Sequence, residues 1–436
     1  MSDYKQLYEQ KRFSADEIAA QVESGWLIGM DAAIAQTPSI MDAVCRRAEK
    51  GELSGIRVQF LLDSYPFAFL DPSNGLAGKV IAEPWFASGG ARNALAAGIA
   101  DYVPNYYRDC PRHIRANYEY DAFCVSVSPM DKHGFFSLGA TSSYSPAMIE
   151  KAKRIFVEVN ANTPRAVCGT QLHISQIDGL VENTFELPTL PPAKLDEVSI
   201  TIGNLIADQI DDGSCIQLGI GAIPDAVGLA LKTKHDLGIH TEMFTSSMVD
   251  LIECGAVNNS KKQIHRGKSV TTFAFGTKKI NDFIDDNPSI EILPVDYVNN
   301  PEVICQNDNM ISINAALEVD LFGQVCAESI GTKIMSGSGG QVDYVRGACQ
   351  SRGGKSFIAF SSTAKGGTIS KIKPILTPGA VVTTSKNDVD YIVTEYGLAH
   401  LRGETLSSRV KQLIAIAHPD FRDELRFEAK KRGILI

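Results

Sequence analysis

The chain contains 436 residues, of which 44% are hydrophobic and 21% are charged. This length predicts two or three domains, and the ordinary composition excludes a disordered, collagen-like or coiled-coil protein. The net charge of −9 repels nucleic acid and anionic lipid overall, so a site for an anion must be local. No apolar run reaches the roughly 20 residues that cross a bilayer, and the N-terminal sequence is too polar for a signal peptide. We therefore expect a cytoplasmic protein that binds neither nucleic acid nor membranes.

The nine cysteines are scattered along the chain, and no two of them form a CxxC pair. This spacing argues against zinc ribbons and thioredoxin-type redox sites. The eight histidines contain no HExxH motif. We expect buried structural thiols and no metal site.

Helical and extended patterns alternate in the first half of the chain. A cap-like Ser14 followed by apolar residues at helical spacing predicts a helix over residues 14–22. Apolar runs predict strands at residues 56–62, 122–128 and 153–160. We expect a short helix between the last two strands, with Ser145 as its cap and Pro146 in its first turn. Such alternation is typical of an α/β fold with a mainly parallel sheet.

The best candidate for a linker is the stretch 187–193, which contains three prolines and therefore resists both helix and central strand. The alternation then restarts as helix, strand, helix and strand, at residues 196–209, 215–218, 225–232 and 238–244. Further strands are expected at residues 270–275, 290–295, 311–313, 357–360 and 380–384. We predict two α/β domains, residues 1–188 and residues 189–436.

The segment after the strand at 215–218 has the strongest signal for chemistry. The strand leads into Gly219-Ile220-Gly221, and a helix begins near Pro224, a residue suited to a first helical turn. The glycines allow a ligand close to the backbone, and the helix start offers free N–H groups and a positive dipole end. The segment fits a site for an anion or a polarised carbonyl, and it also fits an ordinary tight turn.

A single glutamate, Glu242, lies in the next expected strand, residues 238–244. If the strand–helix–strand segment is a βαβ unit, Glu242 and the glycine turn lie at the same carboxyl edge of the sheet. One possible chemistry is dinucleotide binding, with Glu242 on a ribose hydroxyl, but Pro224 replaces the third glycine of that fingerprint. The other is covalent catalysis by a carboxylate nucleophile, with loop N–H groups stabilising an oxyanion.

Three further features lie in the second half. Asn299 offers carboxamide donors in a turn, and the glycine-rich stretch 336–340 either exposes N–H groups to a ligand or forms a flexible loop. Four basic residues also cluster, and a solvated face explains such a cluster more often than a phosphate site: Lys261, Lys262, Arg266 and Lys268.

Taken together, six stretches resemble the acetyl-CoA hydrolase/transferase family of class I CoA-transferases, with the closest likeness to 4-hydroxybutyrate and butyryl-CoA:acetate CoA-transferases. They begin at Met130 (MDKHGFF), Gln217 (QLGIGAIPDA), Gly238 (GIHTEM), Pro294 (PVDYVNNP), Ser336 (SGSGGQVD) and Val393 (VTEYGLA). The resemblance covers nearly the whole chain. It implies two similar open α/β domains of the NagB/RpiA/CoA-transferase type, with the active site between them and the nucleophile in the second.

The resemblance also implies residue roles. Glu242 would be the nucleophile of a ping-pong reaction through an acyl-glutamyl anhydride and a glutamyl-CoA thioester. Asn299 and the N–H of Gly340 would be oxyanion donors. The residues expected to face CoA are Gly219, Ile220, Gly221, Ala222 and Ile223, with Asn314, Ser336 and Lys365 as further contacts. Coenzyme A and acyl-CoA would be substrates, with no permanently bound cofactor and no metal, and the protein would be a homodimer or a higher homo-oligomer.

Two alternatives remain open. The same site could serve an acyl-CoA hydrolase, with water replacing the second carboxylate. A nucleotide-dependent oxidoreductase or sensor is the alternative from another class. The acid is also open, since butyrate, 4-hydroxybutyrate, propionate, itaconate and acetate all fit the resemblance.

Overall fold

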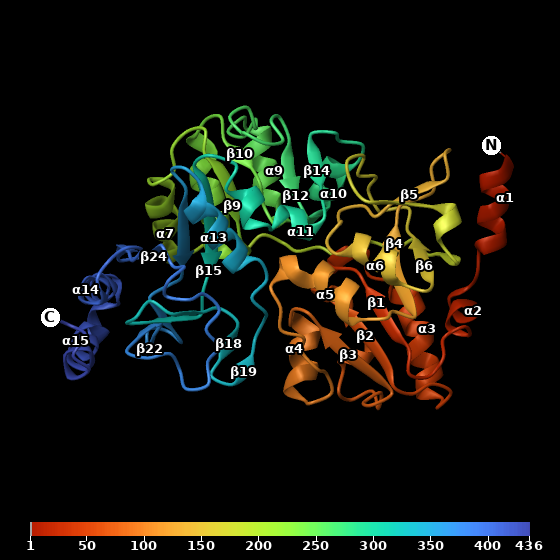
Figure 1. Ribbon diagram of the computed structural model, residues 1–436, viewed down its shortest axis with the longest axis horizontal. Helices are drawn as coiled ribbons and strands as arrows, with labels where there is room; N and C mark the ends of the chain where they lie inside the picture. The colour runs from red at the N-terminus through yellow and green to blue at the C-terminus, as the bar shows by residue number, and fades with distance from the viewer. Residues whose placement is uncertain (1) are drawn as a thin grey trace. The chain divides into compact units, whose positions relative to one another are not determined.

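Two six-stranded sheets, one in each half of the chain, form the framework of the molecule (Figure 1). The computed structural model describes residues 2–436, with side chains from residue 4 onward. Contacts between Cα atoms divide the chain into two units, Met1–Leu190 with Val270–Val298, and Pro191–Ser269 with Asn299–Ile436. The two mainly parallel sheets confirm the predicted α/β fold class.

All six strands of the first sheet are parallel, in the order β3-β2-β1-β4-β6-β8. The strands are β1 (Leu27–Met30), β2 (Ile56–Phe60), β3 (Val80–Pro84), β4 (Ala122–Val127), β6 (Ile155–Val159) and β8 (Gly179–Glu182). Every residue of β4 and β6 is buried, as expected for a parallel sheet that is covered on both faces.

Helices cover both faces of this sheet. Ile28 and Met30 of β1 share a hydrophobic core with Ile40 and Met41 of α3 (Pro38–Glu49), whereas the intervening Gly29 faces Met148 of α6 (Ser145–Lys151). Neighbouring residues of a strand point to opposite faces, so α3 and α6 lie on opposite sides. The other helices of this unit are α1 (Ser2–Lys11), α2 (Ala15–Ala19), α4 (Gly89–Ala96), α5 (Cys110–Asn117), α10 (Lys278–Ile284) and α11 (Val295–Val298).

The second sheet has the order β10-β9-β15-β20-β24-β25. Its first five strands are parallel, and β25 runs antiparallel to β24. The strands are β9 (Cys215–Leu218), β10 (Gly238–Ile239), β15 (Met310–Ala315), β20 (Lys355–Ala359), β24 (Tyr391–Thr394) and β25 (Gly397–His400). The helices of this unit are α7 (Glu197–Ala207), α8 (Ala222–Ala230), α9 (Ser246–Glu253), α12 (Pro301–Ile304), α13 (Gln341–Gln350), α14 (Leu406–Ile416) and α15 (Arg422–Lys431).

Several predicted elements are confirmed with small shifts. Ser14 caps α2 through a capping box with Glu17, and residues 183–196 around the predicted linker contain neither helix nor strand. The prediction for Ser145 as a cap was wrong: Tyr144 is the N-cap of α6, and the Ser145 hydroxyl instead donates to the buried carboxylate of Asp31.

Three strand predictions need correction. Residues 238–244 form two short strands, β10 and β11 (Met243–Phe244), and residues 270–275 also divide, into β12 (Ser269–Thr271) and β13 (Phe273–Ala274). The predicted strand at 380–384 is absent from the described chain, where Thr384 forms only an isolated bridge with Val325. Thr383 N donates to Val325 O at 2.8 Å, but Val381 N donates to the side-chain Oγ of Ser329 at 2.9 Å. An apolar run alone does not specify the regular backbone pairing that makes a strand.

The segment 270–298, which sequence analysis assigned to residues 189–436, belongs to the first unit. Hydrogen bonds explain this position: Thr272 O accepts from the backbone N–H groups of Ser142 and Ser143, and Ala274 N donates to Ala140 O at 2.7 Å. The position of residues 270–298 in the second half of the sequence does not indicate that they form these long-range bonds with the first half. Among the described residues, no helix combines the length and apolar character that crossing a bilayer requires.

Candidate active site

A βαβ unit builds the centre of the candidate site. Strand β9 leads through α8 to β10, and the two strands pair in parallel, with Gly238 opposite Cys215. The loops that follow β9 and β10 therefore lie at the same carboxyl edge of the sheet, where ligand sites of open α/β sheets lie. The predicted parallel βαβ unit is confirmed.

Glu242 follows β10 by three residues and is half-buried. Its Oε2 accepts a hydrogen bond from Nδ2 of Asn299 at 2.6 Å, and its carboxylate also accepts one from the backbone N–H of Gly340. Burial raises the pKa of Glu242 to about 7, while the two hydrogen bonds act in the opposite direction. The structure thus brings together the three residues for which the resemblance implied the chemistry.

Helix starts place both donors. Gly340 is the N-cap of α13, and Asn299 directly precedes Asn300, the N-cap of α12. A Cβ added to Gly340 would overlap both Oε2 of Glu242 and Nδ2 of Asn299, so only glycine leaves room for this arrangement. The N-terminal end of the α13 dipole also favours a negative charge beside it. Gln341 fixes this helix start, because its Nε2 donates to Ala315 O at 2.9 Å.

The glycine turn after β9 has the conformation that the sequence suggested. Gly219 N donates to Ile313 O at 2.9 Å, and Gly221, the N-cap of α8, has φ of +116°, a backbone conformation that side chains disfavour. Helix α8 begins at Ala222, three residues before the predicted start at residue 225. Ile220 between the two glycines is 51% exposed, so this turn lies at the surface of the unit.

The other residues predicted to contact CoA have different surroundings. Asn314 lies near the end of β15 and donates to Oγ of Ser312 at 2.9 Å, at the same sheet edge as the glycine turn. The Ser336 hydroxyl donates to the backbone carbonyls of Ala327 and Gly337 at 3.3 Å. Lys365 is exposed and has φ of +48°, in the turn between β21 (Thr363–Ala364) and β22 (Ile369–Ser370).

Sequence analysis missed two residues beside the candidate nucleophile. Tyr344 is fully buried in α13; burial raises its pKa, and the charge of Glu242 raises that pKa further. His240 is also fully buried, and its ring centroid lies 6.4 Å from that of Tyr344. One signal was available, because Tyr344 follows Gly340 by about one helical turn and so shares its helix face.

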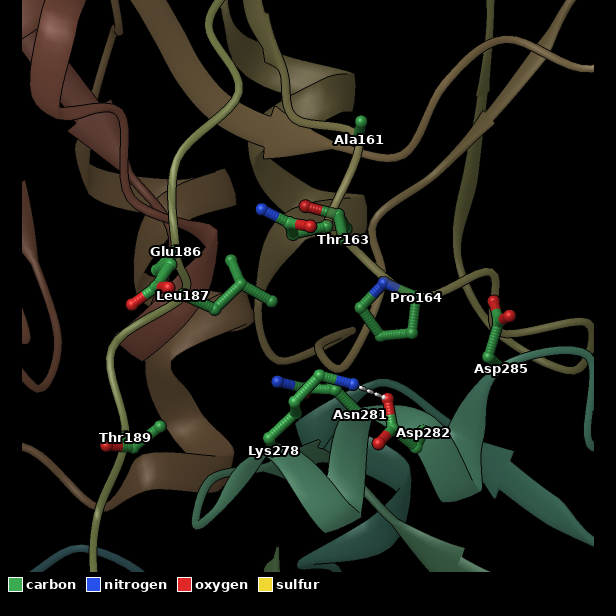
Figure 2. Close-up of a pocket in the computed structure, with 11 residues that line it drawn as sticks. Ala161, Thr163, Pro164, Glu186, Leu187, Thr189, Lys278, Asn281, Asp282 and Asp285 are labelled. Carbon is green, nitrogen blue, oxygen red and sulfur yellow. Dashed lines mark hydrogen bonds and ion pairs between the residues drawn. The ribbon is translucent and has the colours of Figure 1, made fainter.

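A hollow of about 500 Å³ in the first unit contains none of the predicted site residues (Figure 2). Three carboxylates, Glu186, Asp282 and Asp285, line it together with one ammonium group, that of Lys278. The excess of negative charge opposes a phosphate-bearing ligand such as CoA. We therefore do not assign the substrate to this hollow.

Two family models match most of the chain. They are described as the acetyl-CoA hydrolase/transferase N-terminal domain, over residues 1–190, and the acetyl-CoA hydrolase/transferase C-terminal domain, over residues 276–429. The glycine turn and Glu242 lie between the two matched ranges.

Known relatives match over nearly the full length. The chain is 46% identical to succinyl-CoA:cyclohexane-1-carboxylate CoA transferase of Geobacter metallireducens, covering 98% of this chain and 97% of that protein. It is 43% identical to 4-hydroxybutyrate coenzyme A transferase of Clostridium kluyveri, covering 99% of this chain and 100% of that protein. The crystal structure of RipA from Yersinia pestis superposes with a TM-score of 0.94 at 38% identity, covering 99% of this chain and 100% of that one. The chain therefore belongs to the acetyl-CoA hydrolase/transferase family and is an enzyme of the CoA-transferase class.

Proposed function

We propose that the protein is an acyl-CoA:carboxylate CoA-transferase in which Glu242 carries CoA between two acids. The observation that supports this most strongly is the Glu242 carboxylate, held at Oε2 by Asn299 and accepting a second hydrogen bond from Gly340 N. A half-buried carboxylate beside two preorganised N–H donors suits nucleophilic attack on an activated acyl group.

The first half-reaction has two steps. The Glu242 carboxylate attacks the thioester carbonyl of the acyl-CoA, forms an acyl-glutamyl anhydride and expels the CoA thiolate. The thiolate then attacks the glutamyl carbonyl of the anhydride, forms a glutamyl-CoA thioester and releases the first carboxylate. An incoming carboxylate reverses both steps and leaves as the new acyl-CoA, so that the Glu242 carboxylate is regenerated.

Each site residue has a defined part in these steps. When the thiolate attacks the glutamyl carbonyl, negative charge develops on the glutamyl oxygen. Asn299, which donates to Oε2, and the Gly340 N–H, which donates to the same carboxylate, would stabilise that charge. The glycine turn from Gly219 to Ile223 and the edge residue Asn314 would bind CoA. Binding energy from the distant nucleotide part of CoA would help to drive formation of the anhydride.

The substrates that we propose are short-chain acids such as butyrate or 4-hydroxybutyrate, with acetate or acetyl-CoA as the exchange partner. Relatives that cover nearly the whole chain are named for 4-hydroxybutyrate and for butyryl-CoA with acetate. A panel of acids assayed against acetyl-CoA, ranked by kcat/KM, would identify the preferred one.

A single-turnover experiment tests the reaction type. Mixing the enzyme with acyl-CoA in the absence of a second acid should release about one equivalent of free carboxylate per active site, while CoA stays on the protein. Free CoA that accumulates over many turnovers in water alone would identify a hydrolase and refute the transferase proposal. The Glu242→Gln variant should show neither release.

A further inference from the structure

Strand β10, which precedes Glu242 by three residues, lies at the edge of its sheet. On one side it pairs with β9 through bonds such as His240 N to Ile216 O at 3.2 Å. On the other side, Leu237 and Ile239 direct their backbone groups away from β9, where the sheet has no further strand. Such outward groups need partners, because a buried N–H or C=O without one is costly.

The segment 256–262 supplies these partners. Leu237 N donates to Ala256 O at 2.9 Å, and Leu237 O accepts from the N–H groups of Asn258 and Asn259 at 3.1 and 3.0 Å. This part of the edge is therefore closed by backbone bonds alone.

At Ile239, side chains take over. Ile239 N donates to Oδ1 of Asn259 at 2.9 Å, and Ile239 O accepts from Nζ of Lys262 at 2.8 Å. Lys262 also donates to Lys268 O at 2.7 Å, and Asn259 donates to Oγ of Ser269 at 3.1 Å. We call Asn259 and Lys262 the edge clamp, because together they hold both backbone groups of Ile239.

The clamp is buried and closely fitted. Lys262 is only 4% exposed, although an ammonium group is costly to bury unless it is fully hydrogen-bonded. Its stem crosses Gly238, where an added Cβ would lie 2.6 Å from the Lys262 Cγ. The basic cluster is thus not a uniformly solvated face: Lys261 and Arg266 are exposed, but Lys262 points inward.

We propose that Lys262 and Asn259 are positioning residues for Glu242. Only His240 and Thr241 separate the clamped Ile239 from Glu242, so fixing Ile239 fixes the point from which the nucleophile projects toward Asn299 and Gly340. This inference rests on the proposed function of Glu242.

The expected loss of rate in the clamp variants can be derived from the geometry of the strand. Loss of the clamp removes the partners of Ile239 N and O on the outer side of a two-residue strand. A displacement of about 1 Å at a reacting group can cost about a hundredfold in rate. Neither clamp residue is among the proposed CoA-binding residues, the glycine turn and Asn314. The binding of CoA should therefore change little.

The first test replaces Lys262 with methionine, which keeps the length of the stem and removes the ammonium group. We expect kcat for acyl exchange to fall ten- to hundredfold while KM for acyl-CoA stays within about twofold. The acid limb of the pH–rate profile should also move to higher pH, because looser hydrogen bonds from Asn299 and Gly340 depress the pKa of Glu242 less. Lys261→Met is the matched control, since Lys261 is the exposed neighbour.

The second test replaces Asn259 with glycine. Asn259 has φ of +58°, which glycine adopts without strain, so this variant removes the Ile239 partner with little backbone cost. If the Lys262→Met variant fails to fold, the Asn259→Gly variant alone tests whether the clamp positions Glu242. Folded clamp variants with wild-type kcat and pH profile would overturn the inference, as would a loss of activity that only tracks the unfolded fraction. Retained exchange in Glu242→Gln would instead refute the proposed function.

Discussion

Replacing Glu242 with glutamine should stabilise the protein at alkaline pH. The carboxyl of Glu242 has its pKa raised by burial from 4.5 to about 7, so above that pH the folded protein contains a charge that its surroundings disfavour. Glutamine has the same shape without the charge, and its side-chain oxygen can accept the hydrogen bond from Asn299.

Proton linkage gives the sign and the size of this difference in the free energy of unfolding. The unfolded chain releases the Glu242 proton near pH 4.5 and the folded chain near pH 7, so the free energy of unfolding falls as pH rises through this interval. The raised pKa corresponds to about 3 kcal/mol, fully expressed above pH 7 and absent below pH 4.5. Burial also raises the pKa of Asp31, to about 7, but Asp31 is present in both proteins and cancels in the difference.

Urea unfolding of the wild type and of Glu242→Gln at pH 5 and pH 8 measures this difference. We expect similar midpoints at pH 5 and a higher midpoint for the variant at pH 8. The control is Glu404→Gln, at an exposed glutamate of the same unit, which should show no comparable pH-dependent gap. A variant that is equally stable or less stable than the wild type at pH 8 would refute the argument that burial disfavours the Glu242 charge.

Three further substitutions test the geometry of the site by steady-state kinetics. Asn299→Ala should lower kcat by about 10²–10³-fold and shift the acid limb to higher pH, because it removes a bond that depresses the pKa of Glu242; an unshifted limb would contradict this. Gly340→Ala should lower kcat about a hundredfold with little change in KM, since its Cβ would overlap both Glu242 and Asn299; wild-type turnover would show that the overlap is relieved elsewhere. Gly221→Ala should cost about 1–3 kcal/mol of stability through its φ of +116° and raise KM for acyl-CoA more than it lowers kcat; an unchanged KM would place CoA away from this turn.

The glycine turn and Glu242 could be located from the sequence because the relevant pattern is local. An apolar strand, two glycines, a helix start and a second strand occupy the 30 consecutive residues from 215 to 244. Because the two strands of a βαβ unit are parallel, Glu242 is expected at the same carboxyl edge of the sheet as the glycine turn. This expectation does not depend on the rest of the fold.

The donors and the clamp could not be located by such reasoning. Asn299 and Gly340 reach Glu242 across 57 and 98 positions of the chain, and only the resemblance to a family suggested their roles. Lys262 sits in a basic run that resembles a solvated surface, and its burial depends on the carbonyls of Ile239 and Lys268 that surround it. The segment 270–298 joins the first unit through backbone hydrogen bonds, which the amino-acid composition of the segment does not indicate.

Chemical trapping at Glu242 tests the central claim most directly. The enzyme is incubated with acyl-CoA, treated with borohydride or hydroxylamine, digested and analysed by mass spectrometry. We expect modification of Glu242 that appears only when acyl-CoA has been added and that disappears when an acceptor carboxylate consumes the thioester first. An unmodified Glu242 in enzyme that still exchanges CoA between acids would contradict it.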